Sequence, residues 1–270
     1  MKQKKIIGLF AYITFVFVFF LTLHRLSINL QSRIEGPHRL VQTMQLEEEG
    51  ITTKAEWKTS QAAPADFPKK AQLSDPELIL VNREHFLPET PTFPEAYTRE
   101  GLVYNALCQE AYEALDRAAQ KAGHHLVCVS AFRSEQDQIN NINSQKAAFM
   151  KEGNTEAEAM QRIEEFTAPP LGSEHLTGLA FDFVDQQWHE DQKPLDPAFE
   201  QEASAQWLKA HASEYGFILR YLKGQEAITG YKFEPWHYRY VGKENAQYIM
   251  KHNLTLEEFL QQVKKYNQPA

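Results

Sequence analysis

The chain has 270 residues, of which 43% are hydrophobic and 12% aromatic, and it carries a formal net charge of −8. This length suits one fair-sized domain with extensions or two small domains, and the apolar content is enough for a core. Nucleic-acid-binding proteins usually present a basic face, so the acidic balance argues against that class.

The first 24 residues have the pattern of a membrane anchor. Three lysines among the first five residues precede an uncharged run of 18 residues from Ile6 to Leu23. A bilayer core takes about 17–25 apolar residues as a helix, and lysines before the run favour a cytoplasmic N-terminus. We therefore expect residues 1–24 to form a cytoplasmic tip and a single transmembrane helix in the cell membrane, with the rest of the chain extracellular. The alternative is a protein secreted after signal cleavage, although the sequence offers no small-x-small cleavage site.

Residues 25–74 show little hydrophobic periodicity, and such a segment buries too little apolar surface to offset the entropy of ordering it. We expect a flexible extracellular stalk here. As a coil of about 50 residues it would span on the order of 40 Å. The folded domain is then expected over residues 75–270.

The domain mixes helix and strand patterns without a βαβ rhythm. Strands are predicted at 77–82, 126–132, 179–184, 217–221 and 236–241. Helices are predicted at 103–122, 134–151, 155–166, 203–215, 243–252 and 255–266, two of which begin with the capping boxes Thr155 to Glu158 and Thr255 to Glu258. This order of elements predicts an α+β fold with antiparallel strands.

Two cysteines are present. Cys108 falls on the apolar face of a predicted helix, and Cys128 falls on a predicted buried strand. We expect two buried free thiols, with a disulfide as the alternative in an exported protein.

Asp182 lies inside an apolar strand pattern, between two phenylalanines that alternate to the other face. A carboxylate there is costly unless it is paired or binds a metal. His175 stands seven residues earlier, in a loop bounded by Gly172 and Gly178. Taken singly, Asp182 is more often the partner of a buried salt bridge, and a loop histidine more often lies on the surface.

His237 lies in an aromatic strand pattern, and Glu234 precedes it by three residues. Two imidazoles, one carboxylate and an open fourth position make a catalytic zinc site, and a second carboxylate can serve as general base. His175 and Asp182 complete such a set with this pair. The His-Glu-x-x-His helix motif of other zinc peptidases does not occur in the chain.

Arg133 follows a predicted buried strand and precedes a predicted helix. A guanidinium in that position can hold a carboxylate or a developing oxyanion through forked hydrogen bonds. A surface arginine at the end of a strand is the alternative interpretation.

Together and in this order, the motifs resemble those of the D-alanyl-D-alanine carboxypeptidases of the VanY type. These zinc peptidases share a fold with the dipeptidase VanX, the Hedgehog signalling domain and murein endopeptidases. The matching signature is Ser-x-x-Arg-Ser-x-x-x-Gln at 130–138, Ser-x-His-x-x-Gly-x-x-x-Asp at 173–182 and Glu-x-x-His at 234–237. The resemblance covers about residues 76–250, and it implies the small antiparallel sheet flanked by helices of that fold.

The resemblance also implies roles for individual residues. Zn2+ would be held by His175, Asp182 and His237. Glu234 would act as the catalytic base and then as the acid for the leaving amine, while Arg133 would stabilise the oxyanion or hold the substrate. Substrate-binding roles are implied for Ser130, Gln138 and Ser173. Trp236 is a candidate for the pocket wall, with plain core packing as its alternative.

The implied activity is zinc-dependent D,D-carboxypeptidase action on a peptidoglycan stem peptide that ends in D-alanine. An L,D-carboxypeptidase acting on tetrapeptide stems, or an endopeptidase acting on cross-links, would use the same machinery. A non-catalytic, zinc-containing cell-wall binding module is a third alternative, against which the presence of Glu234 and Arg133 argues. The expected partners are the stem peptide and, through the N-terminal helix, the membrane; we expect no nucleic acid and a monomeric protein.

Overall fold

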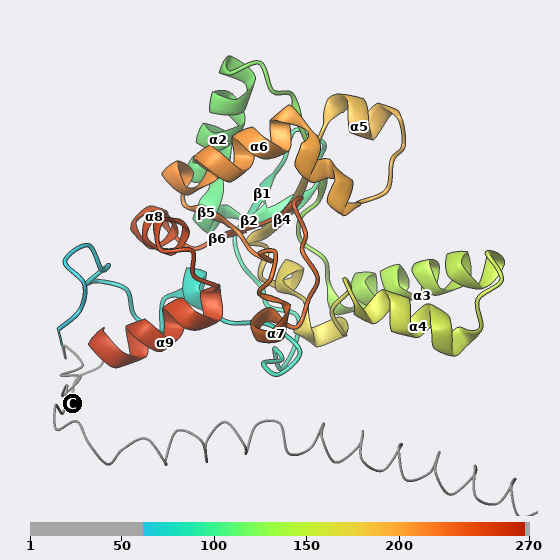
Figure 1. The fold of residues 1–270 in the computed structure, drawn as a ribbon, viewed down its shortest axis with the longest axis horizontal. Coiled ribbons are helices and arrows are strands. Elements are labelled where there is room, and N and C mark those ends of the chain that lie inside the picture. The colour runs from blue at the N-terminus through green and yellow to red at the C-terminus, as the bar shows by residue number, and fades with distance from the viewer. Residues whose placement is uncertain (1–61, 268–270) are drawn as a thin grey trace, which may run out of the picture. The chain divides into compact units, whose positions relative to one another are not determined.

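The computed structural model describes residues 62–267. Its main sheet has four antiparallel strands (Figure 1). Its strand order is β3-β4-β6-β5. The strands are β3 (Leu126–Ser130), β4 (Ala180–Asp185), β5 (Phe217–Leu219) and β6 (His237–Tyr240). A separate short hairpin joins β1 (Glu95–Tyr97) to β2 (Val103–Asn105). The antiparallel sheet and its surrounding helices confirm the predicted α+β class.

The helices of the described part are α2 (Gln109–Lys121), α3 (Glu135–Lys151), α4 (Glu156–Glu164), α5 (Gln186–Glu190), α6 (Ala203–His211), α7 (Glu226–Thr229), α8 (Lys243–Lys251) and α9 (Leu256–Asn267). The capping box at Thr155 forms in both directions, because its hydroxyl accepts from the Glu158 N–H and the Glu158 carboxylate accepts from its N–H. Thr255 and Glu258 make the same pair of bonds ahead of α9. Both predicted helix starts are therefore confirmed.

One side of the sheet packs against α2 and α6. Phe181 and Phe183 of β4 both point into this core, with their ring centroids 5.8 Å apart and nearly parallel. Tyr112 of α2 stacks on Phe181 at 5.1 Å. The alternation of side chains along β4 thus sends its aromatic residues into the largest apolar cluster and leaves its other face free for polar groups.

Helices α3 and α4 form an antiparallel pair that extends away from the sheet (Figure 1). Ion pairs between Lys146 and Glu156 and between Arg162 and Glu152 join the two helices. Within α3 the only buried residue is Gln138, near the end that meets the body of the domain. This helix pair therefore contributes little apolar surface to the core.

The predicted strand at 77–82 is wrong. The segment is a 3-10 turn, η1 (Pro76–Leu78), followed by irregular chain. The apolar pattern is real, since Leu78 and Val81 are buried, but the carbonyls of Glu77 and Ile79 accept hydrogen bonds from the Arg239 side chain instead of from a strand.

The predicted helix at 103–122 begins later than expected. Residues 103–105 form β2, and the α-helix starts at Gln109 after a short 3-10 turn. The partner strand β1 has three residues, too few to give a clear alternation in the sequence. Cys108 and Cys128 are both buried and free, as expected.

The described chain is already packed before Asp75. Phe67 is 3% exposed and lies 5.3 Å from the Tyr248 ring of α8, and Ala71 joins the same cluster. Isolated apolar residues of this kind give no periodic signal, which is why they fell within the stalk predicted at 25–74. Within residues 62–267 no helix has the length and apolar character to cross a bilayer, and the expected anchor at 1–24 lies outside the described residues.

Candidate metal centre

Strand register brings two of the three proposed metal ligands together. Asp182 on β4 stands directly opposite His237 on β6, and Ser130 on β3 faces Asp182 from the other side. His175 comes from the short turn η4 (Glu174–Thr177), which leads into β4. All three ligand candidates are buried, with at most 4% of each residue exposed.

The turn that carries His175 depends on Gly178. This glycine ends η4 with a left-handed backbone, at φ 66°. A Cβ there would lie 2.8 Å from the backbone nitrogen of Asn105 and 2.6 Å from the Phe93 ring, so a larger residue would push the turn away from the β2 end. Gly178 therefore sets the path that returns the chain from His175 to Asp182.

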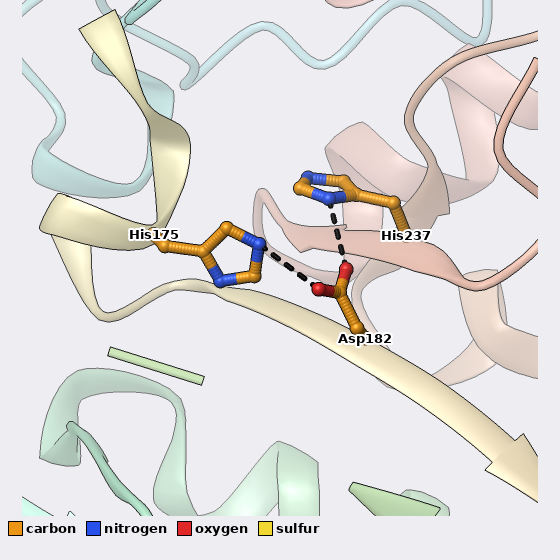
Figure 2. Close-up of side chains that lie close together, drawn as sticks. All are labelled: His175, Asp182 and His237. Carbon is orange, nitrogen blue, oxygen red and sulfur yellow. Dashed lines mark ion pairs between the residues drawn. The ribbon is translucent and has the colours of Figure 1, made fainter. Parts of the chain in front are cut away.

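Figure 2 shows the Asp182 carboxylate between the two imidazole rings, with one oxygen facing each ring. His175 Nε2 lies 3.3 Å from Asp182 Oδ2, and His237 Nδ1 lies 3.1 Å from Oδ1. Ligand atoms about 2.0–2.1 Å from a tetrahedral zinc are separated by about 3.3–3.4 Å, so each imidazole lies near such a spacing from one of the two carboxylate oxygens. Each residue offers one such atom, and the three lie within 4.8 Å of one another.

The hydrogen bonds around the rings also fit a metal. His175 Nδ1 lies 2.6 Å from the Ala131 carbonyl and donates to it, which leaves the Nε2 lone pair free. His237 Nε2 lies 3.3 Å from Glu174 Oε2, which leaves Nδ1 free. Asp182 Oδ1 is buried and has no partner in hydrogen-bonding geometry within the described residues, despite its short distance to His237. A cation shared by the three atoms would satisfy this oxygen.

The protonation states of the site also allow a bound cation. Burial opposes ionisation of Asp182, but contacts with His175 and His237 hold the pKa of its carboxyl well below the usual range. Burial likewise opposes a charged His237, yet the neighbouring carboxylates of Asp182 and Glu174 raise its pKa to about 9. Burial and the nearby Arg133 lower the pKa of His175 to about 4, so that ring is neutral at pH 7. A divalent metal can replace the proton on His237.

Glu234 faces the same site without being one of the three ligands. Its Oε2 lies 3.7 Å from His237 Nδ1, and its backbone is fixed because its N–H donates to the Tyr221 carbonyl. Burial raises the pKa of Glu234 to about 8, and the Asp182 charge adds to this effect. A cation at the neighbouring atoms would lower that pKa towards neutrality, where a general base works best.

Arg133 and Ser130 reach the site from the end of β3. The Arg133 backbone N–H donates to the His175 carbonyl, and its buried Nε has no partner within the described residues. Burial lowers the pKa of Arg133, while the charges of Asp182 and Glu234 act in the opposite direction. Ser130 Oγ lies 3.5 Å from His175 Nδ1. Among the described residues, Arg133 is thus a cation without an ion-pair partner beside the candidate catalytic groups.

The other three predicted residues lie around the site with different contacts. Gln138 is fully buried; its amide donates to the Ala168 carbonyl at 2.7 Å, and its oxygen has no partner among residues 62–267. Ser173 is buried just before η4, and its hydroxyl makes no hydrogen bond to the described residues. Trp236 packs in a small core cluster with Val184, as its alternative interpretation expected.

The charged residues behind His237 were not predicted from the sequence. Glu174 is fully buried and bonds to Arg220, Arg239 and His237. The available signal was an arginine at the end of the apolar run 217–219, where an unpaired charge is costly. Tyr221 was also missed, although its ring lies 4.8 Å from the His237 ring.

Comparison with known proteins agrees with this geometry. The family model "VanY: D-alanyl-D-alanine carboxypeptidase" matches residues 103–243, which include all of the site residues discussed above. YodJ of Bacillus subtilis is 37% identical over 205 residues, covering 72% of this chain and 71% of that protein.

Two solved structures extend the likeness to the fold. The vancomycin resistance D,D-pentapeptidase VanY from a VanB-type cassette, solved with Zn(II), superposes with a TM-score of 0.61 at 31% identity, covering 69% of this chain and 99% of that one. The LD-carboxypeptidase LdcB gives 0.55 at 29% identity, covering 74% and 97%. By sequence and by fold, this chain belongs to the VanY family of D-alanyl-D-alanine carboxypeptidases.

Proposed function

We propose that the protein is a zinc-dependent D,D-carboxypeptidase that removes the terminal D-alanine from peptidoglycan stem peptides. The observation that carries this proposal is the buried set of His175, Asp182 and His237 with the unligated carboxylate of Glu234 beside it. Such a set holds three protein ligands, leaves a fourth metal position open, and supplies a base.

The chain's own residues can then carry the proton. When bound, zinc supplies a Lewis acid that polarises the scissile carbonyl and acidifies water. Glu234 takes one proton from the attacking water as the new C–O bond forms at the carbonyl carbon. As the C–N bond breaks, Glu234 passes that proton to the amine of the departing D-alanine. Water is thus divided between the two products without a covalent enzyme intermediate.

Arg133 is the group best placed to meet negative charge from the substrate. It is a half-buried cation with no ion-pair partner within residues 62–267, its Nε is buried, and the site carboxylates influence it electrostatically. In a site with little water, such a charge stabilises an oxyanion or a terminal carboxylate far more than it would in bulk solvent. The combination of Glu234 with Arg133 supports catalysis over a purely structural zinc site.

The test is hydrolysis by the full-length protein. We would supply pentapeptide and tetrapeptide stems separately, with zinc or with a chelator, and follow free D-alanine by mass spectrometry. Chelator-sensitive release from the pentapeptide alone is the expected result. Release from the tetrapeptide alone would instead assign L,D-carboxypeptidase activity to the same site. The likeness to LdcB makes this activity the second candidate.

A variant pair identifies the base. Glu234→Gln keeps the size of the side chain and the three metal ligands but removes the base, so kcat should fall by about 10²–10⁴. Glu214→Gln is the matched control, because Glu214 is exposed and pairs with His211 away from the site. Equal activity of the two variants would exclude Glu234 as the base.

We further propose that the run from Ile6 to Leu23 anchors the protein in the cell membrane, with the catalytic domain outside. Its uncharged length and the preceding lysines support this placement. Alkaline extraction of membranes should leave the protein in the pellet. Mass spectrometry of that protein should still find its N-terminal residues, including Lys2. A mature protein in the medium that lacks residues 1–24 would show that the run is a cleaved signal.

A further inference from the structure

Behind the metal-facing edge of His237 lies a group of four fully buried or nearly buried charged residues, Glu174, Arg220, Arg239 and Glu257. We propose that Glu174 is a positioning residue of the metal centre, which fixes the tautomer and orientation of His237 for zinc. This role rests on the proposed zinc-dependent function. Glu174 contacts Nε2 of His237, whereas the candidate ligand atom is Nδ1, on the other side of the ring.

The contacts of Glu174 divide between its two oxygens. Oε1 accepts from Arg220 Nε at 2.8 Å and from Arg239 Nη1 at 3.0 Å. Oε2 lies 3.3 Å from His237 Nε2. The side chains of Glu174, Arg220 and Arg239 are all fully buried, so no water competes for these contacts. The ring nitrogen that faces Glu174 must therefore carry the proton, and Nδ1 offers its lone pair to the metal.

Both arginines are themselves held in place. Arg220 makes a forked pair with the Glu257 carboxylate of α9, at 2.9 and 2.7 Å. Arg239 Nη2 donates to the carbonyls of Glu77 and Ile79. Glu174 consequently has no freedom to turn away from His237, because its other oxygen is bound by two anchored guanidinium groups. The two carboxylates balance the two arginines, so the group adds no net charge behind the site.

An amide cannot replace this carboxylate. Three N–H groups point at Glu174, two of them at one oxygen and one at the other, and an amide has a single acceptor atom. If the amide oxygen stays with the arginines, its NH2 faces His237 Nε2. The imidazole then relieves the donor–donor contact by moving its proton to Nδ1, the atom that should bind zinc.

The experiment measures zinc affinity, not hydrolysis. Full-length Glu174→Gln protein would be stripped of metal and titrated with zinc against a chromophoric chelator. We expect Kd to rise by about 10–100-fold, the usual effect of losing a residue that orients a metal-binding histidine. Glu257→Gln is the matched control, because it neutralises a carboxylate of the same buried group that does not touch His237, while Arg239 still holds Glu174 Oε1. Its Kd should stay within about threefold of the wild type.

Unfolding of the metal-free proteins separates positioning from general loss of stability. Both Gln variants remove a charge from Arg220's surroundings, so both should lower the unfolding midpoint, but only Glu174→Gln should weaken zinc binding. Equal zinc affinities in the two variants would overturn the proposal. If Glu174→Gln does not fold, Glu174→Asp replaces it, since the shorter side chain keeps its charge for the arginines and withdraws from His237.

His237→Ala gives the reference for the loss of zinc affinity when a metal ligand is removed. If this variant binds zinc as tightly as the wild type, the metal centre itself is elsewhere and the proposed function fails. If it loses zinc while Glu174→Asp and Glu174→Gln keep wild-type affinity, the centre stands and the positioning role falls. Weakened binding in the Glu174 variants between these limits supports the proposal.

Discussion

The two faces of strand β4 form opposite environments within a few ångströms of each other. One face carries Asp182, set between two imidazoles and close to further buried charges. The other carries Phe181 and Phe183, whose stacked rings pack against Tyr112. The same six-residue strand therefore supplies a reactive centre on one side and much of the core on the other.

Burial has opposite effects on stability on the two faces. On the aromatic face, burial stabilises the fold, by about 1.5–3 kcal/mol for each large apolar side chain. On the polar face, burial destabilises isolated charges and is acceptable when they are paired or bound to a metal. Substitutions that alter one face at a time should thus separate zinc binding from folding.

The largest effect is expected from Asp182→Asn on the polar face. The amide keeps the shape but loses the anionic ligand, so zinc affinity should fall by more than ~100-fold. Hydrolysis should fall by ~10³-fold or more, because a bound metal contributes several kcal/mol to catalysis. Zinc titration and D-alanine release measure the two losses.

Asp185→Asn is the control on the same strand. Asp185 caps α5 by accepting from the Trp188 N–H, a bond that asparagine can also accept. Activity close to wild type is expected. A similar loss of zinc affinity in both variants would mean that the effect comes from the strand and not from a metal ligand.

The next effect is expected from Phe181→Ala on the aromatic face. Removing a fully buried phenylalanine should lower the free energy of unfolding by about 3–5 kcal/mol. Zinc affinity of the folded protein should change little, because the ring points away from the site. Denaturant unfolding in the presence of chelator, together with zinc titration below the transition, tests both statements. A large loss of zinc affinity would show that the two faces are coupled.

A pH titration sharpens the description of the polar face. With the pKa of His237 raised to about 9 in the metal-free protein, zinc must displace a proton at pH 7. Apparent zinc affinity should therefore rise by up to about tenfold per pH unit from pH 6 to about 9 and then level off. Calorimetry in two buffers of different ionisation enthalpy should show about one proton released. Zinc binding without proton release at pH 7 would contradict this account.

The sequence predicted those features that depend on short range. The helix starts at Thr155 and Thr255 depend on residues three apart, and the alternation around Asp182 is visible within five residues. The convergence of His175 and His237 on Asp182 came from the family resemblance, and the geometry of the three groups agrees with it. Local pattern thus sufficed for these helix starts and for the strand around Asp182, and motif order sufficed for the three ligand candidates.

What could not be predicted depends on contacts between distant segments. Glu174 meets residues 46 and 65 positions later in the chain, and nothing near it in sequence marks it as buried. The segment 77–82 has the apolar pattern of a strand, but a side chain takes its carbonyl bonds. Phe67 is one aromatic residue in an otherwise aperiodic stretch. In each case the deciding partner belongs to another part of the fold.

The pairing of Asp182 with His237 across the ladder has a consequence for protein engineering. Because side chains alternate with a period of two, shifting one strand by a single residue would turn one of these ligands towards the aromatic side. Transplanting the three short motifs into another scaffold would therefore not recreate the centre. A successful graft would have to reproduce the alignment of β4 with β6 first, and the residue identities second.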